Sequence, residues 1–266
     1  MSKKRWIPYP RYIFRKKAAL SLIDRYVPKG ASFLEIGCAS GDFGISLAKK
    51  GHSGLMNDFS DEALEEVARG VKEEGITGVR FENKDFLEIG EDDKFDLITM
   101  FEVMEHIEDD KGALRKINEL LNEGGALLCS VPARARLWGA SDVLVGHVKR
   151  YEKKELISLL EKSGFEVVKF FSYGFPWLNI IRIVRDRMSV KALEKKEDKG
   201  RISLTKKSGL NVIAIKTPLF RLLSNKYTLF LPMQISRLFN NMDLAEGYLC
   251  LAVKKSDKYM GSFDGG

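Results

Sequence analysis

The sequence is poor in the residues on which covalent and metal-stabilised scaffolds depend. Its 266 residues contain three cysteines and three histidines. Cys38, Cys129 and Cys250 lie far apart in apolar stretches, and no CxxC spacing occurs. Because free cysteine in such surroundings behaves as a small hydrophobic residue, we expect neither a disulfide framework nor a cysteine-based metal site.

Long apolar runs are absent as well. No stretch reaches the roughly 18 apolar residues that a membrane-spanning helix needs. The first residues (MSKKRWIPYPRYIFRKK) are basic, but they do not lead into an apolar signal core. We therefore expect a cytoplasmic protein.

Acidic residues are in the minority. Lysine and arginine outnumber aspartate and glutamate by 44 to 37, which gives a net charge of +7. The basic residues are scattered outside the N-terminal cluster, and no aromatic-interleaved RNA-binding pattern occurs, which speaks against nucleic acid as a partner. Two interpretations remain, a surface charge that keeps the protein in solution and an anionic partner such as a phosphorylated substrate or a membrane surface.

What the chain does contain, between residues 32 and 172, is a regular alternation of short apolar runs and helix-period segments. The apolar runs are SFLEIG, GLMND, VRFENKD, FDLITMF, ALLCSVP and FEVVKFF. The helix-period segments are 41–50, 60–74, 109–121 and 152–162. Strands that alternate with helices predict βαβ units, so we expect a doubly wound α/β domain with a mainly parallel sheet.

Two further segments accompany this alternation. Residues 1–30 are expected to form an N-terminal helical lead-in, which Pro28 and Gly30 end. Residues 174–245 form a connection too long for an ordinary loop, with a helix candidate at 179–188, and we expect a cap or insertion over the cleft. The domain proper is predicted to comprise residues 31–173 and 246–256, the latter with a last strand at YLCLAV.

A glycine-rich turn follows the first apolar run, in FLEIGCASGDFG. Glycines at a strand-to-helix turn let the backbone approach a ligand closely. The dinucleotide pattern GxGxxG fails, because its second and third positions hold Ala39 and Asp42. Asp58 ends the next strand about 20 residues on, where a carboxylate can accept hydrogen bonds from both ribose hydroxyls.

In their order along the chain, these motifs resemble those of the class I S-adenosylmethionine-dependent methyltransferases. The matching stretches are FLEIGCASGDFG, NDFSDEAL, NKDFLE, FDLITMFEVMEHIEDD and LLNEGGALLCSVP. One departure is Ala39, where the family usually has glycine. The resemblance implies a seven-stranded Rossmann-like sheet, with a helical insertion before its last strand, and S-adenosylmethionine as cofactor.

The resemblance also implies which residues bind that cofactor. They are Arg15, Glu35, Gly37, Cys38, Ala39, Gly41, Asp58, Phe59, Asp85, Phe86 and Phe101. Arg15 is expected to face the cofactor's carboxylate, with Arg11 as a rival for that role.

A narrower resemblance rests on the stretch after the fifth strand, PARARLWGASDVLVGHVKRYEKKELISLLEKSGFEVV. It is similar to a subgroup that includes ubiquinone-pathway O-methyltransferases. Members of this subgroup act on small molecules, quinone precursors or glycan and lipid intermediates. We expect a small-molecule or amphiphilic anionic acceptor, and peripheral contact with a membrane is compatible with it.

The stretch FEVMEH, residues 101–106, places Glu102, Glu105 and His106 at the end of a buried strand. In open α/β sheets ligands bind at that edge. In plant small-RNA 2′-O-methyltransferases and some ubiquinone-pathway enzymes a similar Glu-x-x-Glu-His binds a divalent ion, with His147 here as a possible fourth ligand. Many relatives need no metal, and we predict a metal-free site in which Glu102 lines the pocket.

For transfer to oxygen, His147 is the first candidate for the base, because the pKa of histidine can lie near neutrality. Asp142 is expected to orient His147, and Glu102 is the third catalytic candidate. The alternative is that His147 only braces its loop through Tyr151 or a carbonyl group. Two other functions remain open, methylation of RNA or protein and a non-catalytic cofactor-binding module of the same fold.

Overall fold

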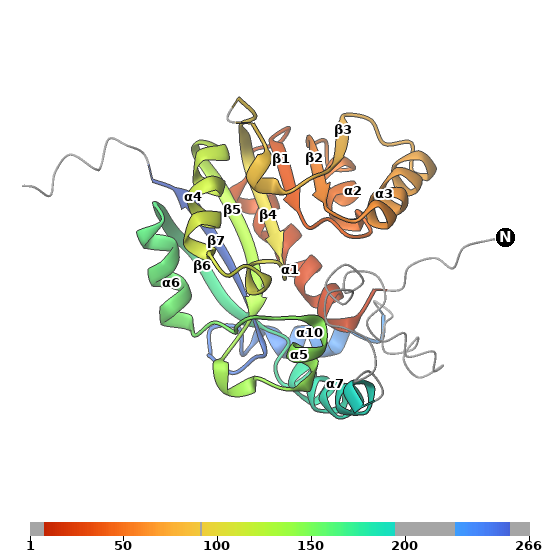
Figure 1. Cartoon of the computed structure of the whole chain (residues 1–266), viewed down its shortest axis with the longest axis vertical. Helices are drawn as coiled ribbons and strands as arrows, with labels where there is room; N and C mark the ends of the chain where they lie inside the picture. The colour runs from red at the N-terminus through yellow and green to blue at the C-terminus, as the bar shows by residue number, and fades with distance from the viewer. Residues whose placement is uncertain (1–7, 91, 195–226, 256–266) are drawn as a thin grey trace, which may run out of the picture.

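A seven-stranded sheet forms the centre of the computed structural model, which describes residues 8–90, 92–194 and 227–255 (Figure 1). Its strand order is β3-β2-β1-β4-β5-β7-β6. The strands are β1 (Ser32–Ile36), β2 (Ser53–Asp58), β3 (Val79–Asn83), β4 (Phe95–Phe101), β5 (Leu121–Pro132), β6 (Phe165–Tyr173) and β7 (Gly247–Lys254). The pairs along β3-β2-β1-β4-β5 are parallel, whereas β7 runs antiparallel to β5 and β6. The predicted α/β fold with a mainly parallel seven-stranded sheet is confirmed.

Helices cover both faces of this sheet. One apolar cluster joins α4 (Asp110–Leu120) and α6 (Lys153–Lys162) to the sheet. The other joins α1 (Pro10–Tyr26), α2 (Asp42–Ala48) and α3 (Asp61–Glu73) to the opposite face. Because both faces are covered, most residues of β1 and β4 are buried and apolar, as in strands of a parallel sheet.

The helix that follows β2 begins where the sequence indicates. The hydroxyl oxygen of Ser60 accepts a hydrogen bond from the Ala63 backbone N–H at 3.3 Å, so Ser60 is the N-cap. Asp61 and Glu62 then occupy the first turn, where negative charge is favourable to the helix dipole.

The chain order creates a switch point beside β1. The chain runs outward from β1 through β2 to β3, and then returns to place β4 on the other side of β1. At such a point the loops after neighbouring strands turn in opposite directions and leave a crevice at the carboxyl edge. The loops after β1, β2 and β4 are therefore the elements that can form a site.

Three helices gather near the end of the molecule toward which β4 and β5 point (Figure 1). They are α5 (Ala140–Val145), α7 (Trp177–Glu194) and α10 (Phe230–Arg237). The expected helix at 179–188 is present but extends farther in both directions, and neither α5 nor α10 was anticipated from the sequence. Residues 195–226 of the expected cap lie outside the described residues. No helix in the described part of the chain is long and apolar enough to cross a bilayer.

Candidate functional site

The glycine-rich turn after β1 adopts left-handed backbone angles. Gly37, Ala39 and Gly41 have φ values of 70°, 47° and 69°. A Cβ atom on Gly37 would lie 2.5 Å from the side chain of Val103 in the loop after β4. This close approach excludes a larger residue at position 37, whereas Ala39 adopts the strained conformation without being glycine.

Asp58, at the end of β2, ties this turn in place. Its carboxylate accepts hydrogen bonds from the backbone N–H of Ala39 at 2.9 Å and of Ser60 at 3.0 Å. Burial raises the pKa of Asp58 above its usual value, although these backbone donors act in the opposite direction. The carboxylate therefore holds the glycine turn after β1 to the end of β2.

Glu35 supports the turn from below. Its side chain is buried in β1 and accepts a hydrogen bond from the Gly44 backbone N–H in α2 at 2.8 Å. Burial raises the pKa of Glu35 to about 8. A Cβ atom on Gly44 would lie 2.6 Å from the Glu35 carboxylate, which explains the glycine at position 44. Glu35 thus fixes the position of the start of α2, which follows the glycine-rich turn.

The other residues expected to bind the cofactor differ in their exposure to solvent. Cys38 is buried within the glycine turn, and Phe59 is half-exposed beyond β2. Asp85 caps the short 3-10 helix η1 (Phe86–Glu88) by accepting from the Leu87 N–H at 3.0 Å, and Phe86 is buried. Phe101, at the end of β4, packs edge-on against Phe43 of α2 with ring centroids 4.8 Å apart.

Two arginines of α1 reach the carboxylate of Glu102. Arg11 lies 2.7 Å and Arg15 3.5 Å from its oxygens, and the Ser130 hydroxyl donates to it at 2.9 Å. Burial alone would raise the pKa of Glu102, but the two guanidinium groups and this hydrogen bond hold it near 2. The Arg15 guanidinium also lies 5.0 Å from the ring centroid of Phe101. Glu102 is therefore ionised, and the two arginines of α1 balance its negative charge.

His147, in the loop after α5, is held by two acidic groups. Its Nδ1 lies 2.7 Å from the Asp142 carboxylate and its Nε2 lies 3.6 Å from Glu105. Burial opposes the charge on Asp142, yet the bonds from His147 and from Arg150, at 2.9 Å, lower its pKa to about 2. The Tyr151 hydroxyl, the alternative partner considered for His147, donates a hydrogen bond to Asp110 at 3.1 Å. An ionised Asp142 fixes the proton of His147 on Nδ1 and leaves Nε2 as the acceptor.

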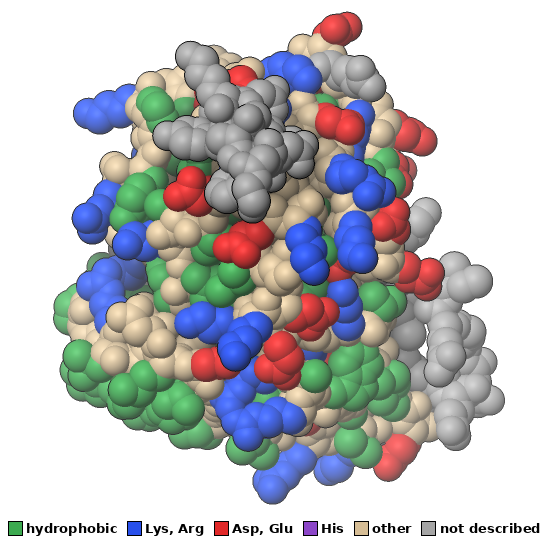
Figure 2. Space-filling model, turned by 90° about the vertical axis from the view of Figure 1, so that its left-hand side faces the viewer, with side chains coloured by type: hydrophobic (Ala, Val, Ile, Leu, Met, Phe, Trp, Pro, Cys, Tyr) green, Lys and Arg blue, Asp and Glu red, His purple; other side chains and the backbone are tan. Residues whose placement is uncertain are grey.

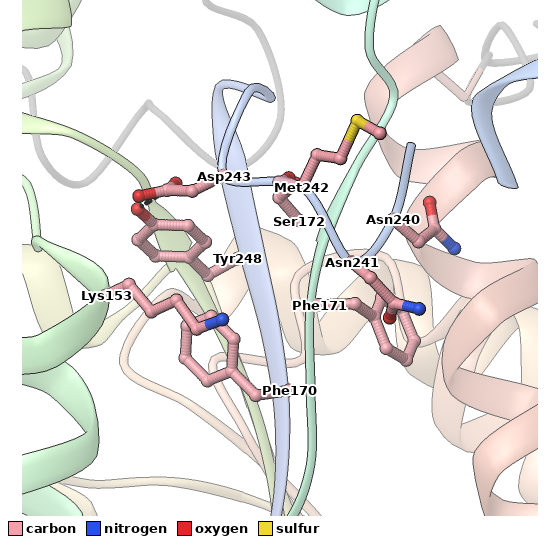
Figure 3. A pocket seen from close by; sticks show the side chains of 9 residues that line it. All are labelled: Lys153, Phe170, Phe171, Ser172, Asn240, Asn241, Met242, Asp243 and Tyr248. Carbon is pink, nitrogen blue, oxygen red and sulfur yellow. Dashed lines mark hydrogen bonds between the residues drawn. The ribbon is translucent and has the colours of Figure 1, made fainter. Parts of the chain in front are cut away.

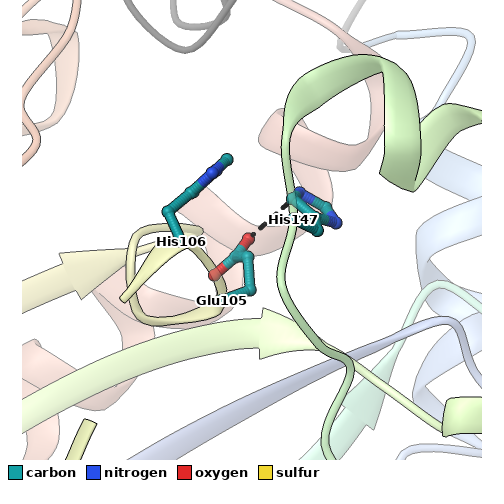
Figure 4. Close-up of side chains that lie close together, drawn as sticks. All are labelled: Glu105, His106 and His147. Carbon is teal, nitrogen blue, oxygen red and sulfur yellow. Dashed lines mark ion pairs between the residues drawn. The ribbon is translucent and has the colours of Figure 1, made fainter. Parts of the chain in front are cut away.

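Glu105, His106 and His147 form a compact cluster, which Figure 4 shows from close by. One ligand atom from each lies within 4.8 Å of the others. Glu105 and His106 belong to the 3-10 helix η2 (Met104–His106), directly after β4. His106 Nδ1 lies 3.2 Å from the Gly146 carbonyl oxygen, so Nε2 is the ring nitrogen of His106 that this contact does not use. Glu102 is not a member of this cluster, although the sequence grouped it with these residues as a metal-ligand candidate.

Burial disfavours the charged forms of two members of this cluster. Glu105 is completely buried, and neither of its oxygens has a hydrogen-bond partner among the described residues. Burial and the charge on Glu102 raise the pKa of Glu105 well above its usual value. Burial lowers the pKa of His106 to about 4. The cluster therefore contains a carboxyl group that only a nearby cation would favour in its charged form.

Four residues of the site were not among the predicted site residues. Ser130 and Tyr173 contact Glu102, Arg150 contacts Asp142, and Glu246 contacts Arg11. Only Arg150 had a sequence signal, as part of the Arg-Tyr pair in the stretch after β5. The other three come from strands or strand ends far along the chain, so no local pattern could indicate them.

A shallow hollow between β6, β7 and the loop at 240–243 lies away from these residues (Figure 3). It holds about 140 Å³ of empty space and opens to solvent. Its polar groups already have partners, since the Tyr248 hydroxyl donates to Asp243 at 2.6 Å and the Lys153 amine lies 5.4 Å from the Phe170 ring centroid. None of the predicted site residues lines it, and we assign it no ligand.

Comparison with known proteins agrees with this geometry. Residues 9–169 match the family model described as a methyltransferase domain. Ubiquinone biosynthesis O-methyltransferase from Pasteurella multocida is 31% identical over 152 residues, which cover 53% of this chain and 60% of that protein. The chain thus covers less than two thirds of this relative's length.

Two solved structures show the same fold. An S-adenosylmethionine-dependent methyltransferase from Clostridium acetobutylicum superposes with a TM-score of 0.57 over 92% of each chain, at 12% identity. The N-methyltransferase NodS from Bradyrhizobium japonicum, in complex with S-adenosyl-L-homocysteine, gives a TM-score of 0.51 at 24% identity, over 61% of this chain and 79% of its own. At these identities the similarity supports the fold and not the substrate.

The buried carboxyl of Glu105 generates a prediction for stability. Folding raises the pKa of Glu105. The free energy of unfolding is therefore unaffected by Glu105 below the pKa of this group in the unfolded chain, and it falls as pH rises toward and through the pKa in the folded protein. Glu105→Gln removes this loss. We expect the variant to melt increasingly above the wild type as pH rises from about 5 to 8, with no such advantage near pH 4.

Thermal melting across this pH range, in metal-free buffer, measures the difference. Glu161→Gln on the exposed side of α6 is the matched control and should show no pH-dependent gain. A Glu105→Gln variant that is less stable than the wild type at every pH would mean that the carboxylate is charged and paired.

Proposed function

The chain belongs to the class I S-adenosylmethionine-dependent methyltransferases, and we propose that it methylates a hydroxyl group of a small, amphiphilic anionic acceptor. The observation that carries this proposal is the contact between His147 and Asp142 in a loop beside the end of β4. Such a pair suits removal of a proton from a hydroxyl nucleophile. It is not needed where the reacting atom of the acceptor is already deprotonated.

The turn after β1 supports binding of the cofactor that the family uses. The left-handed turn through Gly37, Ala39 and Gly41 exposes its backbone at the switch point, and no side chain at position 37 blocks it. We assign the ribose hydroxyls to Asp58, the adenine to Asp85 and Phe86, and the amino-acid carboxylate to Arg15. Bound S-adenosylmethionine supplies a methyl group on a positively charged sulfur, which is a good leaving group.

The protein's own residues have two tasks in this proposal. The turn and the end of β4 hold the acceptor oxygen in line with the methyl group, since alignment supplies most of the rate in such a displacement. His147 Nε2 takes the hydroxyl proton, and Asp142 stabilises the imidazolium that results. Arg150, buried behind Asp142, keeps that carboxylate ionised and in position.

Surface chemistry near His147 supports an amphiphilic acceptor. Trp138, Val143 and Val148 are exposed in the segment that carries His147. The net charge of +7 favours an anionic group on the acceptor. Arg182 and Arg185 of α7 already form ion pairs with Asp186 and Glu246 within the protein, so we do not assign that group to them.

A divalent metal at Glu105, His106 and His147 is the second candidate for activating the acceptor. The donor set fits such an ion, because the Nδ1 atom of each imidazole contacts an oxygen and one ligand atom from each of the three residues lies within 4.8 Å of the others. A cation would also stabilise the charged form of the buried Glu105. Glu105, His106 and His147 would then hold the ion, which would supply Lewis-acid activation of an acceptor hydroxyl.

Replacing Asp58 tests the cofactor assignment. Asp58→Ala should weaken S-adenosylmethionine binding by about 1–3 kcal/mol, because ribose hydroxyls lose their acceptor in a partly buried site. Isothermal titration measures this difference, and NAD serves as the control ligand that should not bind. Unchanged affinity in the variant would restrict Asp58 to bracing the glycine turn.

Replacing His147 tests the base. His147→Ala should lower kcat by about 10²- to 10⁴-fold with KM for the acceptor nearly unchanged, because proton removal occurs only in the transition state. Radiolabelled methyl transfer to a panel of phenolic and lipid-linked acceptors measures both constants. If kcat falls by less than tenfold, His147 has a structural role and the base must be sought elsewhere.

His106→Gln and chelation separate the two candidates. Without a metal, His106→Gln should retain activity within a few-fold, and dialysis against EDTA should leave kcat unchanged. With a metal, both treatments should abolish activity, and Mg²⁺, Mn²⁺ or Zn²⁺ should restore the chelated wild type. Elemental analysis of the purified protein provides the independent reading of metal content.

A further inference from the structure

Helix α7 turns its aliphatic side outward. Ile180, Ile183, Val184 and Val190 are each between 46% and 54% exposed. These positions follow the spacing i, i+3, i+4 and i+10, which places them on one face of the helix. Arg187 and Lys191 continue the same stripe and are exposed. We call these six residues the α7 stripe.

The side of α7 that faces the protein is rich in polar residues. Arg185 donates to the buried carboxylate of Glu246 at 2.8 Å, and Asn179 donates to the Leu244 carbonyl at 2.9 Å. Asp186 accepts from Ser141 of α5 and pairs with Arg182 at 2.7 Å. Of the residues on this side, Leu178 and Ser189 are fully buried.

This distribution departs from the usual pattern of a surface helix. An ordinary surface helix buries its apolar face and shows polar residues to water. In α7, Trp177, Leu178 and Ile181 pack on the apolar core, and ion pairs and hydrogen bonds attach the rest of the inner side. A second, aliphatic face has no cover among the described residues. Isolated exposed apolar residues need no explanation, but a continuous aliphatic stripe marks a surface that contacts something apolar.

The surroundings of the stripe add an aromatic and further positive charge. Trp138 is 43% exposed, and the Gly139 that follows it lies against Asp186 of α7. Arg136, two residues earlier, is also exposed. At the end of the molecule where Figure 1 places α5, α7 and α10, Figure 2 shows hydrophobic side chains gathered among lysines and arginines.

We propose that the α7 stripe docks on the surface of a bilayer that contains anionic lipids. Aliphatic residues on one helix face, with tryptophan and arginine or lysine beside them, match the boundary between acyl chains and anionic headgroups. A second copy of the chain fits less well, because a two-fold contact along the stripe would bring Arg187 and Lys191 toward their own equivalents. This docking does not depend on the methyl-transfer proposal.

Vesicle flotation tests the docking with the full-length protein. Vesicles of phosphatidylcholine with phosphatidylglycerol should carry the wild type upward, and vesicles of phosphatidylcholine alone should carry at least tenfold less. Ile183→Glu with Val184→Glu should reduce binding to the anionic vesicles at least tenfold. Arg187→Glu with Lys191→Glu should do the same, and added salt should weaken the wild type.

Matched controls change equivalent positions elsewhere. Phe81→Glu introduces a charge at an exposed apolar residue of β3, and Lys111→Glu with Arg115→Glu reverses two charges on α4. Both controls should bind as the wild type does. Failure of the wild type to float, or equal loss in stripe and control variants, overturns the proposal. A dimer in light scattering that the Ile183→Glu and Val184→Glu changes dissociate, without vesicle binding, would assign the stripe to a second copy.

Discussion

Burial of ionisable groups at the carboxyl end of β4 is the constraint on which this site depends. A charged group removed from water needs a partner of opposite sign, and without one it becomes neutral. Glu102 and Asp142 follow the first course, through Arg11 and Arg15 and through His147 and Arg150. Glu105 follows the second, because burial raises its pKa. Carboxyl groups with lowered and with raised pKa values thus lie close together at this edge of the sheet.

The same constraint joins distant parts of the chain. Glu246, buried just before β7, pairs with Arg185 of α7 at 2.8 Å and lies 3.6 Å from Arg11 of α1. One carboxylate therefore connects the N-terminal helix, the last strand and the helix that follows β6. Replacing such a buried group leaves its arginine partners uncompensated, so the lead-in helix and α7 are coupled to the site through charge.

Local patterns predicted the elements, and long-range contacts determined the site. The alternation of apolar runs and helix-period segments predicted the sheet, and the segment 60–74 predicted α3, because these signals lie within one element. The partners of Glu102 could not be predicted, since Ser130 and Tyr173 belong to other strands. Helix α5 has six residues, too few for a helical period to be recognised. The polar residues on the inner side of α7 could not be assigned from the sequence, because their partners Glu246 and Ser141 lie in other elements.

The central claim is that His147 accepts a proton at Nε2 while Asp142 holds the proton on Nδ1. Nitrogen-15 NMR of histidine-labelled protein, with S-adenosyl-L-homocysteine bound, tests this directly. The account predicts that Nδ1 carries the proton shared with Asp142, and Asp142→Asn should change that tautomer. A proton resting on Nε2, or a metal bound there in the active protein, would contradict the claim.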